Sequence, residues 1–148
     1  MVKVLITGIN GFVGKHLARE FIKRDYGVIG VGHETPPHVE VRSLAEQYFA
    51  CDLTDAALVE RLPLKEVDAV ISLAGLAALG PSFDKPDEYM HVNTAVLSVI
   101  CDEIIKQGLQ PNIRMLAVSS GAVYASGQPM PLTEESSTDP GSSPYTAS

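Results

Sequence analysis

The sequence has 148 residues, of which 45% are hydrophobic and 20% charged, and its formal net charge is −7. This length suits one domain with a complete core, and an acidic chain without a Lys/Arg cluster argues against a nucleic-acid partner. No apolar run approaches the roughly 20 residues of a membrane-spanning helix, and the beginning lacks a signal-peptide pattern, so we expect a cytoplasmic protein without membrane contact.

Apolar runs alternate with amphipathic segments along the chain. A near-continuous apolar run at 2–7 predicts a strand buried on both faces, and the helical spacing of Val13, Leu17 and Phe21 predicts a helix over 12–24. This alternation favours a doubly wound parallel α/β sheet with right-handed crossovers. We further expect strands at 27–32, 47–51, 67–73 and 113–119, a short helix at 54–62 capped by Thr54, a long helix at 86–107 stopped by Gly108, and a loop from 125 to 143.

Three glycines lie where the first strand passes into the first helix, in the spacing Gly8-x-x-Gly11-x-x-Gly14. The first allows a tight turn, the second lets the backbone approach a pyrophosphate, and the third lets the helix lie close to the sheet. Backbone N–H groups and the positive end of the helix dipole then face the phosphates. This position predicts a Rossmann-type site for an NAD-type dinucleotide. The other loop residues expected to contact the cofactor are Asn10, Phe12 and Val13.

The choice between NAD and NADP depends on the end of the second strand, where NAD enzymes of this fold place an acid. Gly32 stands at that position and His33 follows it, so the acid is absent and His33 could donate to a 2′-phosphate. Glu34 argues the other way, because a shift in the turn would let it replace the acid. Together these residues slightly favour NADP over NAD as the cofactor. Asp52, after the third strand, could accept a hydrogen bond from adenine or cap a helix.

Several further motifs occur in order with the glycine loop, and together they cover the whole chain. They resemble the extended short-chain dehydrogenase/reductase family, the NAD-dependent epimerases and dehydratases of nucleotide sugars. The motifs are Asp52-Leu53, Leu73-Ala74-Gly75, Asn93, Ser119-Ser120-x-x-Val123-Tyr124 and Pro144-Tyr145-x-x-Ser148.

The resemblance implies a role for each motif. Tyr145 matches the tyrosine of the Tyr-x-x-x-Lys motif, the general acid/base, and Ser120 matches the catalytic serine that hydrogen-bonds the reacting sugar oxygen. Asn93 would support the active site from the long central helix. The segments that would line the cofactor are Asp52-Leu53 and Leu73-Ala74-Gly75, the latter passing under its ribose. No histidine or cysteine lies at metal-ligand spacing, so no metal is expected.

The motifs do not decide between the reaction types of the family. Dehydratases of the family carry an acid where this chain has Gly121 and Ala122, which argues against water elimination. The segment 74–93 is similar to UDP-galactose 4-epimerases, except that Ala77 replaces their lysine, and 82–89 also resembles 4-ketosugar-nucleotide reductases. We rank the reductase slightly ahead of the epimerase. A non-catalytic dinucleotide-sensing or interaction module is the alternative from another class.

The resemblance also bears on the extent of the protein. The family's lysine would follow Ser148, and the family's substrate-binding region lies further along, so 1–148 is expected to be the dinucleotide-binding portion of a longer enzyme and inactive by itself. Family members pair long helices across a two-fold axis. The helix at 86–107 therefore leads us to expect a homodimer of the full-length protein, with a nucleotide sugar as its substrate.

Overall fold

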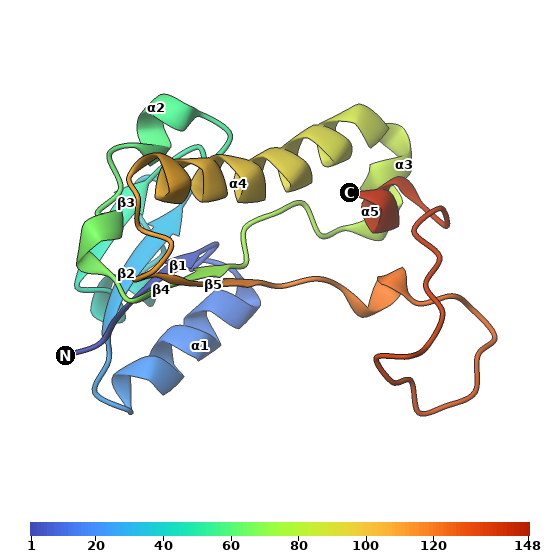
Figure 1. Ribbon diagram of the computed structural model, residues 1–148, viewed down its shortest axis with the longest axis horizontal. Helices are drawn as coiled ribbons and strands as arrows, with labels where there is room; N and C mark the ends of the chain where they lie inside the picture. Colours follow the sequence, from blue (N-terminus) through green and yellow to red (C-terminus); the bar gives the residue numbers. More distant parts are fainter. The chain divides into compact units, whose positions relative to one another are not determined.

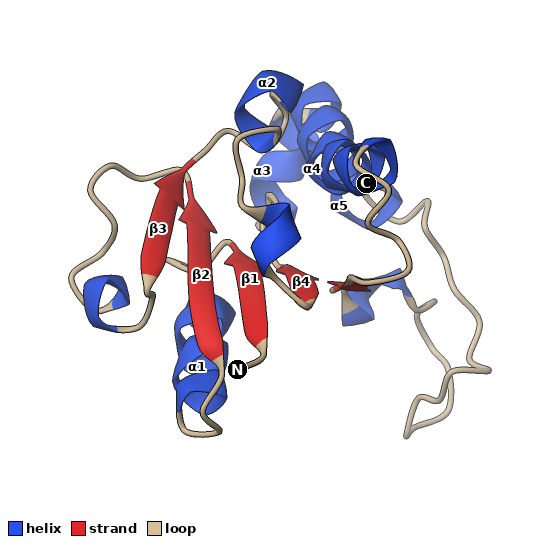
Figure 2. Ribbon diagram, turned by 60° about the vertical axis from the view of Figure 1, so that its left-hand side comes forward, coloured by secondary structure: helices blue, strands red, loops and turns tan.

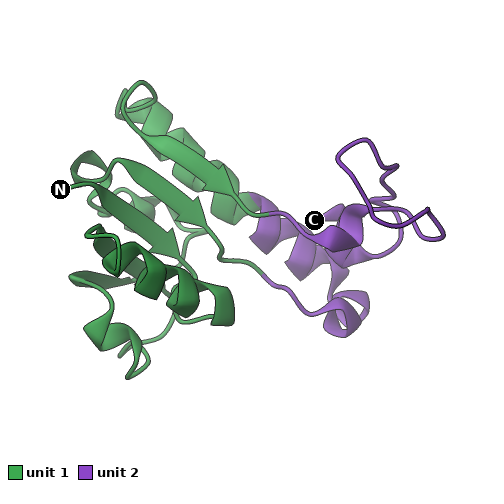
Figure 3. Cartoon of the chain, turned by 90° about the horizontal axis from the view of Figure 1, so that it is seen from below, with its two compact units in different colours: residues 1–75, 95–118 green, residues 76–94, 119–148 purple.

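The computed structural model describes residues 1–148 and divides them into two compact units (Figure 3). Unit 1 consists of 1–75 and 95–118, and unit 2 consists of 76–94 and 119–148. Helix α4, Pro86–Lys106, contributes residues to both units. None of the helices combines the length and apolar character needed to cross a membrane.

Unit 1 is built on a parallel sheet of five strands in the order β3-β2-β1-β4-β5 (Figures 1 and 2). The strand order reverses between β1 and β4, which makes the sheet doubly wound, and the predicted Rossmann architecture is confirmed. The strands are β1 Lys3–Thr7, β2 Gly27–Gly32, β3 Gln47–Ala50, β4 Ala69–Ser72 and β5 Arg114–Ala117.

Helices cover both faces of this sheet, and the central strands β1, β2 and β4 are therefore largely apolar and buried, whereas the edge strands β3 and β5 are partly exposed. Helix α1, Phe12–Ile22, packs its buried Ala18 on Val4 and Ile6 of β1. Leu5 points to the opposite face by strand alternation and is also fully buried. In Figure 1 the end of α4 that belongs to unit 1 runs along the side of the sheet opposite α1, with Ile100 fully buried.

The predicted elements form, with shorter ends in most cases. Helix α2, Ala56–Val59, is capped by Asp55, whose side chain accepts from the backbone of Ala57 at 2.8 Å. The prediction that Thr54 caps this helix is wrong, because the Thr54 hydroxyl donates to the Asp52 carboxylate at 2.7 Å instead. Gly108 ends α4 with φ of 68°, as predicted, since only glycine adopts this conformation at little cost.

Unit 2 contains two short helices that the sequence pattern did not predict, α3 Leu79–Asp84 and α5 Pro144–Ala147, which pack against each other. A single 3-10 turn, η3, covers Gly121–Val123 and contacts α5. The expected loop from 125 to 143 has no helix or strand, only one isolated bridge between Tyr124 and Thr138.

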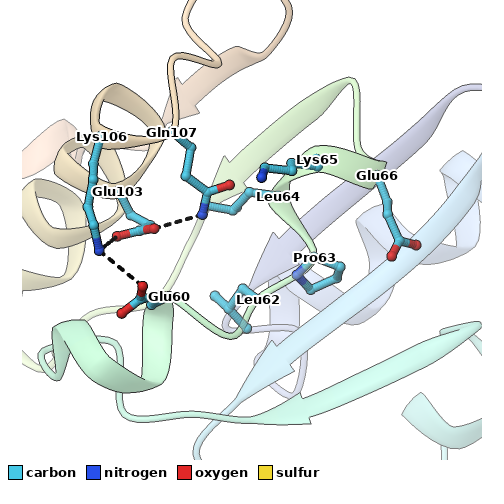
Figure 4. A pocket seen from close by; sticks show the side chains of 9 residues that line it. All are labelled: Glu60, Leu62, Pro63, Leu64, Lys65, Glu66, Glu103, Lys106 and Gln107. Atoms are coloured by element: carbon cyan, nitrogen blue, oxygen red, sulfur yellow. Dashed lines mark hydrogen bonds and ion pairs between the residues drawn. The ribbon is translucent and has the colours of Figure 1, made fainter.

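A cavity of about 550 Å³ in unit 1 lies between the segment that leads into β4 and the end of α4 (Figure 4). The Glu103 side chain is only 7% exposed and accepts from Gln107 at 2.7 Å and from Lys106 at 3.3 Å. Lys106 also pairs with Glu60 at 3.2 Å. Because these groups satisfy one another and the cavity borders the amino end of β4, it is a structural feature at the edge opposite the usual ligand site of such sheets.

The Glu103 ion pair predicts an acid-sensitive contribution to stability. The hydrogen bond from Gln107 lowers the pKa of Glu103 below its ordinary 4.5, burial opposes this shift, and Lys106 lowers the pKa further. A carboxyl whose pKa is lowered by folding stabilises the fold above its unfolded pKa and loses this effect as the pH falls through its folded pKa. Glu103→Gln should therefore be less stable than wild type at neutral pH, and the difference should shrink below pH 4.5.

Urea unfolding midpoints across this pH range measure the difference. Glu66→Gln is the matched control, because Glu66 lines the same cavity without an ion pair. A Glu103→Gln deficit that stays constant with pH would contradict this account of the carboxylate.

Candidate functional site

The turn after β1 is locked against the turn after β4, at the point where the strand order reverses. The Thr7 hydroxyl is fully buried and accepts from the backbone N–H groups of Leu73 and Ala74, both at 3.1 Å. Gly8 follows with φ of 65°, and a β-carbon on it would lie 3.0 Å from the Ala74 nitrogen. The chain therefore needs glycine at this position both for its conformation and for its close approach to the neighbouring turn.

The other two glycines serve two different purposes. A β-carbon on Gly14 would lie 2.5 Å from the Gly8 oxygen and 2.7 Å from the Ile9 α-carbon, both backbone atoms, so α1 can begin here only without a side chain. A β-carbon on Gly11 would meet only the Gly8 oxygen, at 3.1 Å. Gly14 is thus required by packing, whereas Gly11 leaves its outer side open.

The beginning of α1 is suited to an anion. Gly11 occupies the N-cap position without a side-chain hydrogen bond, and no acid lies in the first turn. Phe12 and Val13 are 78% and 56% exposed, so their side chains extend into solvent and are not packed into the core. The first N–H groups of a helix have no partner in the helix and carry the positive end of its dipole, which together favour a phosphate.

Asn10 ties the glycine loop to the segment after β2. Its side chain is 6% exposed; Nδ2 donates to the Glu34 carboxylate and, at 2.9 Å, to the Tyr48 hydroxyl. Tyr48 in turn donates to the Glu34 backbone oxygen at 2.8 Å, and the His38 backbone N–H donates to Asn10 Oδ1 at 3.2 Å. The loop after β2 thus has a fixed conformation next to the glycine turn.

Of the other residues expected near the cofactor, His33 and Asp52 have exposed side chains, whereas the side chain of Leu53 is buried. His33 Nε2 lies 4.0 Å from Asp52 Oδ2, and both side chains are exposed. Asp52 Oδ1 accepts from the backbone N–H of Thr54 at 2.9 Å, so one oxygen of this carboxylate stabilises the turn that follows β3. The Leu53 side chain is 5% exposed and belongs to the core, which leaves only its backbone for a ligand.

In unit 2, Asn93 of α4 joins two segments that are distant in sequence. Its Oδ1 accepts from the Leu76 N–H at 2.7 Å, and its Nδ2 donates to the Leu76 oxygen at 3.1 Å. Nδ2 also donates to the Ser148 hydroxyl at 2.8 Å, and Ser148 donates to the Tyr145 backbone oxygen at 2.9 Å. Asn93 therefore fixes the end of α5 against the segment that follows Gly75.

Tyr145 is held in a defined place although α5 is short. Ser143 and Thr146 form a capping box at the start of α5, with Pro144 as its first residue. The Tyr145 ring packs edge-to-face on the ring of the buried Tyr89, with centroids 6.5 Å apart and planes at 89°. The capping box thus fixes the backbone at Tyr145, and the Tyr89 ring orients its phenol ring.

Ser120 caps the 3-10 turn that contacts α5. Its hydroxyl oxygen accepts from the Ala122 backbone N–H at 3.1 Å, which leaves the hydroxyl hydrogen available to donate. The structure thus places Ser120 beside η3 and Tyr145 on α5, in two segments of unit 2 that pack together.

The sequence-based prediction assigned no contact to several residues of these networks, among them Thr7, Tyr48 and Ser148. The available signal was weak. Thr7 is a hydroxyl residue directly after the apolar run Val4-Leu5-Ile6 of β1, and Tyr48 is the only residue of β3 with a phenol. Their partners are distant in the chain, so spacing alone could not identify them.

Comparisons with known proteins identify relatives of the kind that the sequence motifs resemble. The model of the NAD dependent epimerase/dehydratase family matches residues 4–148. A UDP-glucose 4-epimerase of Bacillus subtilis is 28% identical over 140 residues, which is 89% of this chain and 40% of that protein.

Two solved structures add to this. A UDP-glucose 4-epimerase from Bifidobacterium longum, in complex with NAD+ and UDP, aligns with a TM-score of 0.86 at 31% identity, over 99% of this chain and 45% of that one. An NAD dependent NDP-hexosamine 5,6-dehydratase of tunicamycin biosynthesis aligns with a TM-score of 0.82 at 26% identity, over 99% of this chain and 46% of that one. The chain therefore spans less than half the length of these relatives.

The glycine geometry predicts opposite outcomes for two substitutions. Gly11→Val should still fold, with a small shift of the Gly8 oxygen, but lose an NAD-type dinucleotide by about a hundredfold, equal to roughly 2.7 kcal/mol, because its isopropyl group fills the space before the N–H groups of α1. Gly14→Val should fail to fold, because its β-carbon overlaps backbone atoms that cannot move separately.

Circular dichroism and calorimetric titration of the purified variants distinguish the two effects. Gly141→Val is the control, since its β-carbon would meet only the Asp139 carboxylate, at an ordinary 3.5 Å. Wild-type affinity in a folded Gly11→Val would refute the phosphate cradle.

Proposed function

Because the chain belongs to the NAD dependent epimerase/dehydratase family, we propose that it is the cofactor-binding portion of a nucleotide-sugar 4-epimerase that acts on a UDP-hexose. The observation that carries this proposal is that the chain has both a glycine loop open to a phosphate in unit 1 and, within unit 2, a tyrosine held on α5. A protein that only recognises a dinucleotide would need the first of these and not the second.

The residues of the chain fit an NAD-type cofactor, because the first turn of α1 carries no acid and the N–H groups that begin this helix have no partner within it. When bound, the cofactor supplies hydride transfer to and from the carbinol carbon of the sugar. Leu73, Ala74 and Gly75 line the same edge through the turn that Thr7 holds in place.

Hydride transfer requires a proton to move on the sugar oxygen, and the candidate residues for this step lie in unit 2. We assign Tyr145 as the general acid/base that takes the proton from the sugar 4-hydroxyl and returns it from the same phenolic oxygen. Ser120 donates a hydrogen bond to that sugar oxygen with the hydroxyl hydrogen that its turn leaves available. Asn93 acts as a positioning residue, since its contacts run to Leu76 and, through Ser148, to Tyr145.

The relatives change the order of the candidate reactions. The Bacillus subtilis and Bifidobacterium longum proteins are both UDP-glucose 4-epimerases, which favours the epimerase over the 4-ketosugar reductase that the motifs ranked slightly ahead. The dehydratase among the structural neighbours acts by elimination, for which Gly121 and Ala122 offer no acid. The reductase and the non-catalytic sensor stay as alternative outcomes of the assay.

We also propose NAD as the cofactor, instead of the NADP toward which the sequence pattern leaned. The Bifidobacterium longum structure contains NAD+, and His33, the expected phosphate donor, lies beside the Asp52 carboxylate. A homodimer of the intact protein remains our proposal for its assembly. Exposed Met90 and Ile105 on α4 are the apolar side chains that such an interface would cover.

An activity assay tests the assigned reaction. The intact protein should convert UDP-glucose to UDP-galactose, and Tyr145→Phe should lower kcat by about a hundredfold or more while NAD affinity stays unchanged. Tyr26→Phe is the matched control, because Tyr26 packs on Phe21 in unit 1 and its hydroxyl makes no hydrogen bond.

Other results would replace the proposal. Reduction of a 4-ketosugar nucleotide without epimerisation would favour the reductase. Binding of NAD with no turnover of either substrate would favour the sensor.

A further inference from the structure

The space beside Gly32, where the second strand ends, is filled from elsewhere in unit 1. A β-carbon on Gly32 would lie 3.2 Å from Glu34 Oε2, and 2.6 Å from both Asn10 Nδ2 and the Tyr48 hydroxyl. Enzymes of this fold that bind NAD use an acid at the end of this strand to hold the ribose 2′-hydroxyl. A carboxylate is therefore present at that place, although the residue at the strand end is glycine.

Glu34 is held there at both its side chain and its backbone. Asn10 donates to its carboxylate, and Tyr48 donates to its backbone oxygen at 2.8 Å. Asn10 and Tyr48 are themselves joined at 2.9 Å, so the three residues form a closed set of hydrogen bonds. The Glu34 side chain is still 46% exposed, which leaves it within reach of a ligand.

The charge of the surroundings favours a ligand without a phosphate at this point. Burial opposes ionisation of Glu34, but hydrogen bonds from its own backbone and from Asn10, with the charge of His38, keep its pKa below the ordinary value. The nearby cationic candidates both face carboxylates: His38 lies 3.9 Å from Glu34, and His33 lies 4.0 Å from Asp52. A 2′-phosphate here would meet two negative side chains.

We propose that Glu34, folded back over Gly32 and held by Tyr48 and Asn10, replaces the strand-end acid and makes this chain select a dinucleotide with a free ribose 2′-hydroxyl over one with a 2′-phosphate. Tyr48 is then a positioning residue for cofactor selection and acts through Glu34. This inference rests on the proposed dinucleotide site and goes beyond it, because it assigns discrimination to residues outside the glycine loop.

Calorimetric titration of the purified protein with NAD and with NADP tests the assignment. Wild type should bind NAD at least about tenfold more tightly than NADP. Glu34→Gln keeps the size of the side chain and removes its charge, so the preference should fall to about threefold or less, mainly through tighter NADP binding. Tyr48→Phe should lose about fivefold in NAD affinity, the effect of one hydrogen bond, and should also narrow the preference.

Tyr26→Phe is again the control and should match wild type in both affinities. The ratio of the two affinities is the decisive quantity, since a general loss of folded protein would lower both affinities together. A wild-type preference for NADP, or an unchanged ratio in Glu34→Gln, would overturn the role of Glu34. An unchanged ratio in Tyr48→Phe would overturn that of Tyr48. A wild type that binds neither dinucleotide would instead refute the proposed function itself.

Discussion

The candidate site depends on the close approach of three backbone segments at the strand-order reversal. The turn after β1 touches the turn after β4, and α1 begins directly against the same turn, so β-carbons at Gly8 and Gly14 would overlap backbone atoms or crowd them. The buried Thr7 hydroxyl adds two hydrogen bonds across the gap between the turns. Because this corner is rigid, the unpaired N–H groups of α1 stay directed outward, and this is the property that a phosphate requires.

The chemistry of the chain divides between its two units. Unit 1 carries the glycine loop and the Glu34 network, to which we assign cofactor recognition, and the Tyr48 hydroxyl of this network is already engaged with Glu34 and Asn10. Unit 2 carries hydroxyl groups on short segments that depend on caps, aromatic packing and Asn93 for their position. The relatives that align along nearly the whole chain include both epimerases and a dehydratase.

Much of unit 1 could be predicted from the sequence, because its signals are local. Buried parallel strands are continuous apolar runs, and the glycine spacing marks the passage from β1 to α1. Contacts between distant residues were not predictable: Tyr48 donates to the backbone of Glu34, and the Glu34 carboxylate lies beside Gly32, where the sequence shows no acid at the strand end. In unit 2, α3 and α5 are too short for a periodic pattern; they pack against each other, and α5 has a capping box in addition.

Hydrogen–deuterium exchange of the protein with and without saturating NAD tests the central claim most directly, since it reports on the backbone N–H groups themselves. The account predicts slower exchange at 8–14, where these groups face the phosphates, and at 73–75, which shares the same edge. The segment 62–66, which lines the separate cavity, should be unaffected. Unchanged exchange at 8–14, or protection confined to 62–66, would contradict the assignment of the site.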